Sequence, residues 1–154
     1  MPLPLKGMKV VDMTQVLMGP SCTMHLADQG ADVIKVEPPG GESWRNSYTS
    51  EKLSKHNQSR PFLALNRNKR GIVVDMSKES GRGVVHKLAA WADVFVINMR
   101  PKTSKKLKVD YDILSAINPR LVYAEITGYG TDGPDVDLPG YDAILQARSG
   151  IMFS

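Results

Sequence analysis

Apolar side chains and cations follow several short apolar runs of this sequence, and together they could hold a ligand. The apolar members are Val16, Met18, Met76 and Met99, and the cations are Arg100, Lys102, Lys105 and Lys106. Apolar side chains can bury an aromatic base or a long uncharged arm, while Lys and Arg pair with phosphates. The mixture therefore favours a phosphorylated ligand with an extended apolar part, a description that coenzyme A (CoA) fits.

A second interpretation of the same residues needs no ligand. Methionine commonly fills irregular gaps in a hydrophobic core, and a charged run such as 102–108 is typical of a solvated helix face. Spacing along the sequence does not separate the two interpretations, so both stay open at this point.

Other reactive side chains give weaker signals. His25, His56 and His86 are far apart and on different predicted elements, which disfavours a metal site or a catalytic triad. A single cysteine, Cys22, excludes an intramolecular disulfide and a cysteine-based zinc cluster, and favours a reducing compartment. We expect Cys22 on the buried stripe of a helix, as a packed thiol and not a nucleophile. We expect no metal ion.

Three aspartates stand where a strand ends or a helix begins. Asp12 and Asp75 each end an apolar run, where a carboxylate can face a ligand or only cap the following loop. Asp142 begins an expected helix, where capping and the helix dipole favour an acid without any catalytic role.

Strand-like and helix-like segments alternate along the whole chain. The expected strands are at 9–13, 31–37, 71–76, 93–98 and 121–127, and the expected helices are at 21–29, 79–93, 110–119 and 141–150. This alternation predicts an α/β fold with a Rossmann-like, doubly wound and mainly parallel sheet. Ligands of such sheets bind at the carboxyl ends of the strands, where the residues named above are expected. The stretch 38–70 has no sustained period, which predicts a functional or mobile loop.

Composition and missing motifs narrow the function further. A chain of 154 residues has the length of about one domain, and 42% hydrophobic and 23% charged residues are ordinary for a globular protein. The turn after the first expected strand lacks the GxGxxG fingerprint and the chain lacks GxxxxGK[ST], which disfavours a nicotinamide-dependent oxidoreductase and a nucleoside triphosphatase. No targeting segment and no long apolar stretch is present, so we expect a cytoplasmic protein without a membrane span.

Several blocks of the sequence, taken together, resemble one known family. They are LKGMKVVDMTQVLMGPSCTMHLADQGADVIKVEPPGG, NRNKRGIVVDM, ADVFVINMRP, YDILSAINPRLVYAEITGYGTDGP and PGYDAILQARSG. In this order and spacing they resemble the amino-terminal part of the class III CoA-transferases, also called the CaiB/BaiF family. The resemblance covers essentially the whole chain.

The resemblance implies an enzyme that transfers CoA between an acyl-CoA and a carboxylic acid. An aspartate of the enzyme attacks the thioester, and a mixed anhydride and then an aspartyl-CoA thioester form. The resemblance also implies a smaller second domain, an interlocked homodimer, no tightly bound cofactor, and no nucleic-acid or membrane partner. The CoA contacts of the family correspond to Val16, Met18, Val74, Asp75, Met76, Asn98, Met99 and Lys106. Some members have an arginine at position 106, so lysine keeps the charge there without the bidentate geometry.

Two departures from the family pattern bear on activity. The family's nucleophilic aspartate lies a few tens of residues after the block around Asp142, so we expect it beyond Ser154 and expect no catalytic residue in this chain. Residues 1–154 would then be the amino-terminal CoA-binding portion of the large domain, truncated, weakly active or inactive, and prone to associate. Tyr141, expected near the active site, replaces a histidine acid/base of the related α-methylacyl-CoA racemases, and a tyrosine with a pKa of about 10 is a poor base. A CoA-transferase is therefore preferred over a racemase-type isomerase, and a non-catalytic CoA-binding module is the other alternative.

Overall fold

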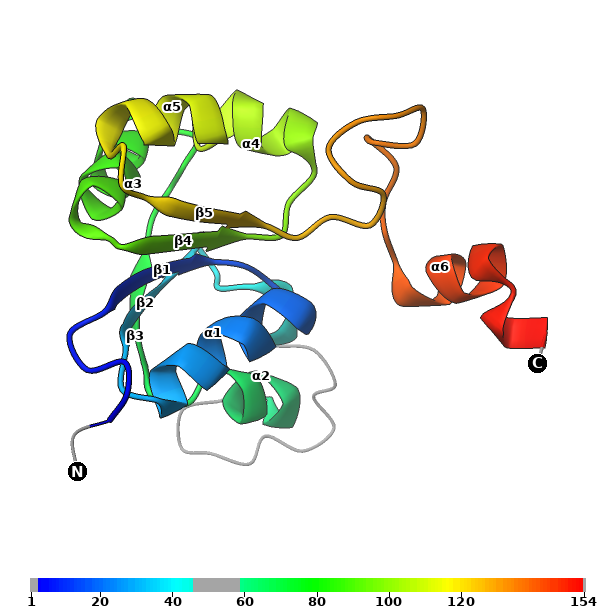
Figure 1. Cartoon of the computed structure of the whole chain (residues 1–154), viewed down its shortest axis with the longest axis horizontal. Helices are drawn as coiled ribbons and strands as arrows, with labels where there is room; N and C mark the ends of the chain where they lie inside the picture. Colours follow the sequence, from blue (N-terminus) through cyan, green and yellow to red (C-terminus); the bar gives the residue numbers. More distant parts are fainter. Residues whose placement is uncertain (1–2, 46–58, 154) are drawn as a thin grey trace.

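A computed structural model describes residues 3–45 and 59–153 of the chain. Its centre is a sheet of β1 (Lys9–Met13), β2 (Asp32–Glu37), β3 (Lys69–Val73), β4 (Val94–Ile97) and β5 (Val122–Glu125). All neighbouring strands are parallel, and their order is β3-β2-β1-β4-β5 (Figure 1). The chain builds the sheet outward from β1 in both directions, so the topological switch point lies between β1 and β4. The predicted Rossmann-like α/β fold is confirmed.

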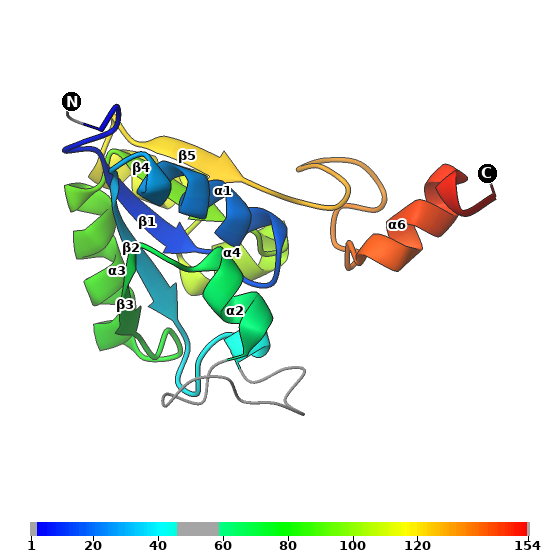
Figure 2. The ribbon, with the colours of Figure 1, turned by 90° about the horizontal axis from the view of Figure 1, so that it is seen from below.

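Helices cover both faces of this sheet. On one face lie α1 (Met18–Asp28) and α2 (Arg60–Leu65), and on the other lie α3 (Glu79–Trp91), α4 (Pro101–Leu107) and α5 (Tyr111–Ile117) (Figure 1). Short 3-10 helices occur at η1 (Ser43–Arg45) and η2 (Ile151–Phe153). The last α-helix, α6 (Asp142–Ser149), lies beyond β5 and projects away from the sheet (Figure 2). None of the described helices is long and apolar enough to cross a membrane.

Two apolar cores hold these layers together. The larger core packs strand residues such as Val11, Phe95 and Ile97 against Val85 of α3 and Leu114 of α5, all of them fully buried. The smaller core lies on the α1 face and contains Val10, Ala27, Ala31, Val33 and Val96. Successive side chains of the strands therefore point alternately to the two faces, as expected for a sheet covered on both sides.

Local capping signals predicted several element ends correctly. Asp110 accepts a hydrogen bond from the Ile113 N–H at 3.4 Å and begins α5, and Gly150 ends α6 with a φ of 82°. The strands β1, β2, β4 and β5 also lie within their expected ranges. These positions were predictable because each depends on residues close together in the sequence.

Two local expectations were wrong. The first helix begins at Met18 instead of residue 21, and Cys22 is exposed, because the buried stripe contains Pro20, Thr23 and Met24. The third strand occupies Lys69–Val73 instead of 71–76. Part of the unpatterned stretch 38–70 forms η1 and α2, and its middle lies outside the described residues.

Candidate functional site

A cavity of about 270 Å³ lies at the carboxyl ends of the strands. The predicted residues Val74, Asp75, Met76 and Met99 line it, together with Met13, Gln15, Val36, Glu37, Pro38, Pro39, Ser77, Thr103 and Leu107. These residues come from the ends of β1 to β4 and from α4, so the cavity spans the topological switch point where doubly wound sheets bind ligands. We call it the strand-end cavity.

The walls of the strand-end cavity are part of the larger core. Val74 and Met76 are buried in that core, and Met99 packs against it. The two interpretations of the methionines are therefore compatible, because the same side chains fill the core and line the cavity. A wall anchored in this way is largely preformed, which reduces the ordering cost of binding a ligand.

Asp75 caps a turn at the rim of the strand-end cavity. Its Oδ1 accepts hydrogen bonds from the Ser77 N–H at 3.1 Å and from the Ser77 hydroxyl at 2.6 Å. These bonds hold the pKa of Asp75 below its usual value. The ionised carboxylate stays partly exposed, with Lys78 Nζ at 3.5 Å, so it both caps the turn before α3 and faces the cavity.

The loop after β1, residues 14–17, is called the β1 loop. The Asn98 side chain is directed to this loop: its Oδ1 accepts from the Gln15 N–H at 2.9 Å, and its Nδ2 donates to the Gln15 carbonyl at 2.7 Å. Both polar atoms of the Asn98 amide thus have backbone partners. Val16 has a φ of 70°, a conformation that costs a non-glycine residue about 1–3 kcal/mol and is especially unfavourable for a β-branched one.

The remaining predicted residues lie outside the lining of the strand-end cavity. Val16 and Met18 are 38% and 64% exposed, and they follow Gln15, which does line it. Lys106 is exposed on α4, between turns of the helix that contribute Thr103 and Leu107 to the cavity. Tyr141 is 69% exposed and occupies the N-cap position of α6, where its side chain makes no capping hydrogen bond.

Asp12 does not face a ligand. Its carboxylate is fully buried, where Oδ2 accepts from Lys69 Nζ at 2.9 Å and from the Thr23 hydroxyl at 2.7 Å. Lys35 Nζ lies 3.9 Å from the same oxygen. Burial lowers the pKa of Lys69, and the attraction of Asp12 opposes that shift. Its Oδ1 accepts from the Thr14 N–H at 3.0 Å, so of the two roles open to Asp12 the structure supports capping of the following loop.

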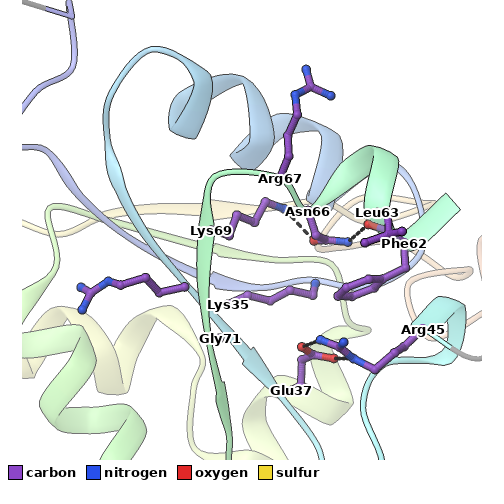
Figure 3. Close-up of a pocket in the computed structure, with 10 residues that line it drawn as sticks. Lys35, Glu37, Arg45, Phe62, Leu63, Asn66, Arg67, Lys69 and Gly71 are labelled. Atoms are coloured by element: carbon purple, nitrogen blue, oxygen red, sulfur yellow. Dashed lines mark hydrogen bonds and ion pairs between the residues drawn. The ribbon is translucent and has the colours of Figure 1, made fainter. Parts of the chain in front are cut away.

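A second cavity, of about 370 Å³, lies under α2 and is lined by charged side chains (Figure 3). Arg45 donates from Nε to Glu37 Oε2 at 2.9 Å and lies 3.9 Å from the centre of the Phe62 ring. Burial raises the pKa of Glu37, but the bonds from Arg45 and the Glu42 N–H outweigh it and hold the pKa below its usual value. Lys69 donates at 2.9 Å to each of Asp12, the Pro20 carbonyl and Asn66.

Each of the five cations that line this second cavity is already paired with a carboxylate of the chain, so an anionic ligand would have to compete with these partners. The smaller strand-end cavity offers apolar walls at the switch point, and it is the candidate ligand site. Sequence reasoning missed the second cavity. The available signal was a lysine, Lys35, inside an apolar run that was expected to be covered on both faces.

The described residues contain no group of three or more His, Cys, Asp or Glu side chains that could hold a metal ion. His25 and His86 lie on α1 and α3, on opposite faces of the sheet. His56 lies outside the described residues.

A doubly wound α/β sheet with an apolar cavity at its switch point is typical of domains that bind nucleotides or cofactors. Such domains have many different functions. Residues 5–154 match the family model of CoA-transferase family III. The chain belongs to this family, and the resemblance found in the sequence is confirmed.

Individual relatives agree with this assignment. The chain is 44% identical over 154 residues to an acyl-CoA transferase of Fusarium pseudograminearum, covering 96% of this chain and 34% of the relative. It is 42% identical over 153 residues to the succinyl-CoA:glutarate CoA-transferase of Mus musculus, covering 97% of this chain and 34% of the relative. The crystal structure of a CaiB/BaiF family protein from Brucella suis superposes with a TM-score of 0.92 at 41% identity, covering 99% of this chain and 40% of that one. The chain thus spans about a third of the length of the curated relatives it matches.

Proposed function

We propose that this chain provides the CoA-binding part of an acyl-CoA:carboxylate CoA-transferase. Residues 1–154 would form the amino-terminal, Rossmann-like portion of the large domain. The family resemblance supplies the reaction: a carboxylate of the enzyme attacks the thioester carbonyl and the CoA thiolate leaves. The thiolate then attacks the aspartyl carbonyl of the anhydride and releases the first acid. The resulting aspartyl-CoA thioester passes CoA to the acceptor carboxylate, which regenerates the enzyme carboxylate.

The observation that carries this proposal is the strand-end cavity. Val74, Met76 and Met99 form an apolar wall at the switch point, and its rim carries the ionised Asp75. A volume of about 270 Å³ is below the range of about 300–1,000 Å³ typical of complete small-molecule sites. The cavity would therefore hold one part of CoA, the adenine, and leave the rest on the surrounding surface.

The residues around the strand-end cavity suit that remaining part. Lys106 and its neighbour Lys105 are exposed on α4, where they can act as point charges toward phosphates. Val16 and Met18 expose apolar side chains that can cover the uncharged arm of CoA. Asn98 acts on the backbone of Gln15 and would influence CoA through the β1 loop.

Other properties of the complete enzyme follow from the family resemblance. We propose an interlocked homodimer that acts in the cytoplasm on an acyl-CoA and a carboxylic acid. The resemblance places the family's nucleophilic aspartate after residue 154, and we propose that residues 1–154 alone do not transfer CoA. Formation of a new acyl-CoA by the purified chain, followed by mass spectrometry, would contradict this.

Calorimetric titration of CoA into the purified chain tests the binding role. We expect saturable binding that Lys106→Ala weakens about threefold to fivefold, the worth of one exposed charge pair. Lys87→Ala, an exposed lysine of α3, is the matched control and should leave the affinity unchanged. A chain that circular dichroism shows to be folded but that gives no saturable heat would overturn the proposed function.

A further inference from the structure

The β1 loop is held by side chains from the strands on both sides of β1. Lys35, in β2, donates from Nζ to the Thr14 carbonyl at 2.9 Å. Asn98, just after β4, bonds to both the N–H and the carbonyl of Gln15. Two successive residues of the loop thus have backbone groups fixed from opposite directions.

Val16, the next residue, is fixed by a different side chain. Its N–H donates to Oε2 of Glu42 at 2.9 Å. Val16 has a φ of 70° although its own side chain is partly exposed, so dense packing around that side chain does not impose the conformation. The hydrogen bond to Glu42 is therefore the contact that can hold the left-handed backbone in place.

The hydrogen bonds of Glu42 direct its side chain to Val16. It is 2% exposed, and its own N–H donates to Glu37 Oε2 at 3.1 Å, which fixes its backbone. Among the described residues, its Oε1 is buried and has no hydrogen-bond partner. Of the two carboxylate oxygens, the one that reaches Val16 is thus the one that makes a described bond.

The β1 loop and the first residue of α1 expose three successive apolar side chains. Val16, Leu17 and Met18 are 38%, 50% and 64% exposed, beside the Gln15 that lines the strand-end cavity. The backbone that carries these apolar side chains is already fixed. Binding a ligand to them therefore costs little conformational entropy.

We propose that Glu42 and Asn98 are positioning residues, which hold the β1 loop so that its apolar side chains meet the uncharged arm of CoA. This inference rests on the proposed function. It assigns to Glu42 a role in ligand binding although Glu42 itself does not line the strand-end cavity.

Amide hydrogen exchange of the full chain, read residue by residue by NMR, tests the first half of the proposal. In Glu42→Ala, the Val16 amide should exchange at least about tenfold faster than in the wild type, since a bond to a charged acceptor is lost. Glu42→Gln retains a side-chain oxygen for Val16 and should restore slow exchange. Glu79→Gln removes an exposed carboxylate on α3 and is the matched control, without effect at Val16. An unchanged Val16 amide in Glu42→Ala would overturn the proposal.

Calorimetry with CoA tests the second half. We expect Glu42→Ala to weaken CoA binding at least about fivefold and Glu42→Gln to bind within about twofold of the wild type, while amides in α3 stay protected in both. If Glu42→Ala does not fold, Asn98→Asp carries the test, because it loses the donor to the Gln15 carbonyl and should weaken binding similarly. CoA binding that is equal in the wild type and in these loosened variants would overturn the positioning role and leave the proposed function standing. A folded wild type that does not bind CoA would overturn both the positioning role and the proposed function. Lys106→Ala should weaken CoA binding without changing the exchange of the Val16 amide.

Discussion

On the face of the sheet covered by α3 and α5 the buried side chains are apolar, whereas on the face covered by α1 and α2 they include several charges. Phe95, Ile97 and Leu114 represent the first face, and Asp12 and Lys35 the second. Alternate residues of the same strands supply both faces, since Asp12 lies between Val11 and Met13 of the larger core and Lys35 directly precedes Val36 of the same core. One strand sequence therefore encodes two kinds of interior.

The apolar and the charged interior are stabilised by different kinds of interaction. Apolar packing is non-directional and tolerates similar shapes, whereas a buried charge needs a partner at a fixed distance. The charged face ties β1, β2 and β3 to α1 and to the Glu42 segment through directed bonds, and its bonds from Lys35 and Glu42 reach the β1 loop. The apolar face supplies the wall of the strand-end cavity. Breaking each face should therefore have different consequences.

The largest effect is expected on the charged face. Asp12→Ala leaves Lys69 without its buried carboxylate partner, and breaking a buried pair in this way typically costs about 3–5 kcal/mol. We expect a loss of this size in the free energy of unfolding, measured by urea denaturation. The double variant Asp12→Leu with Lys69→Met removes both members of this pair and leaves buried Lys35 with the Thr14 carbonyl as a partner, so part of that stability should return. If Asp12→Ala is as stable as the wild type, the buried ion pair of Asp12 and Lys69 does not contribute to stability.

A somewhat smaller loss is expected on the apolar face. Leu114 of α5 is fully buried in the larger core, and Leu→Ala substitutions in such positions cost about 2–4 kcal/mol through lost burial and a residual cavity. Leu114→Ala should show the same loss at pH 6 and at pH 8, because no titrating group is removed. Leu114→Met, which nearly conserves volume, is the control and should cost less than about 1.5 kcal/mol. A strongly pH-dependent loss in Leu114→Ala would contradict the contrast between the two faces.

Sequence reasoning predicted the features that depend on neighbouring residues and missed the charged interior, and the reason is physical. The caps at Asp110 and Gly150 and the run of β4 depend on neighbours in the sequence. The partner of Asp12, in contrast, is Lys69, 57 residues away, and a lysine among polar residues, as in the segment 66–70, is typical of an exposed position. The start of β3 and the exposure of Cys22 were mispredicted for the same reason, because Lys69 and Thr23 are both bound to Asp12 inside the fold.

The candidate site divides in the same way. The position of the strand-end cavity and its lining by Val74, Asp75, Met76 and Met99 agree with the expectation that a doubly wound sheet binds ligands at the carboxyl ends of its strands. The direction of the Asn98 side chain was not predictable, because the same amide could face a ligand or a backbone. Glu42 gave no signal, since an acid after two glycines is typical of an exposed turn.

The pH dependence of stability should sharpen the comparison through Glu37. Its folded pKa is lower than its unfolded value, so the stabilisation it provides is complete above the unfolded pKa of about 4.5 and is lost as pH falls through the folded value. Between these values the unfolded chain binds more protons, and stability therefore falls with falling pH. We expect Glu37→Gln to flatten the acid side of the stability curve, measured by thermal unfolding between pH 3 and pH 6 (about the range that carboxylates titrate). Glu79→Gln should leave the slope unchanged, and an equal slope in Glu37→Gln and the wild type would contradict the prediction.

The smallest effect on stability is expected for an exposed ion pair, Arg70 with Asp32. Its geometry resembles that of the more buried pair of Arg45 and Glu37. Arg70 donates to Asp32 through Nε at 2.9 Å and Nη2 at 2.7 Å, while the two side chains are 64% and 44% exposed. Water already solvates both ions, so the pair is expected to contribute no more than about 1 kcal/mol. Arg70→Ala should therefore change the free energy of unfolding by less than that, and added salt should reduce the difference. Arg45→Ala, which leaves Glu37 buried without its guanidinium partner, should cost clearly more in the same urea titration. Equal costs for the two arginines would mean that bidentate geometry, and not burial, determines what a charge contributes on this face.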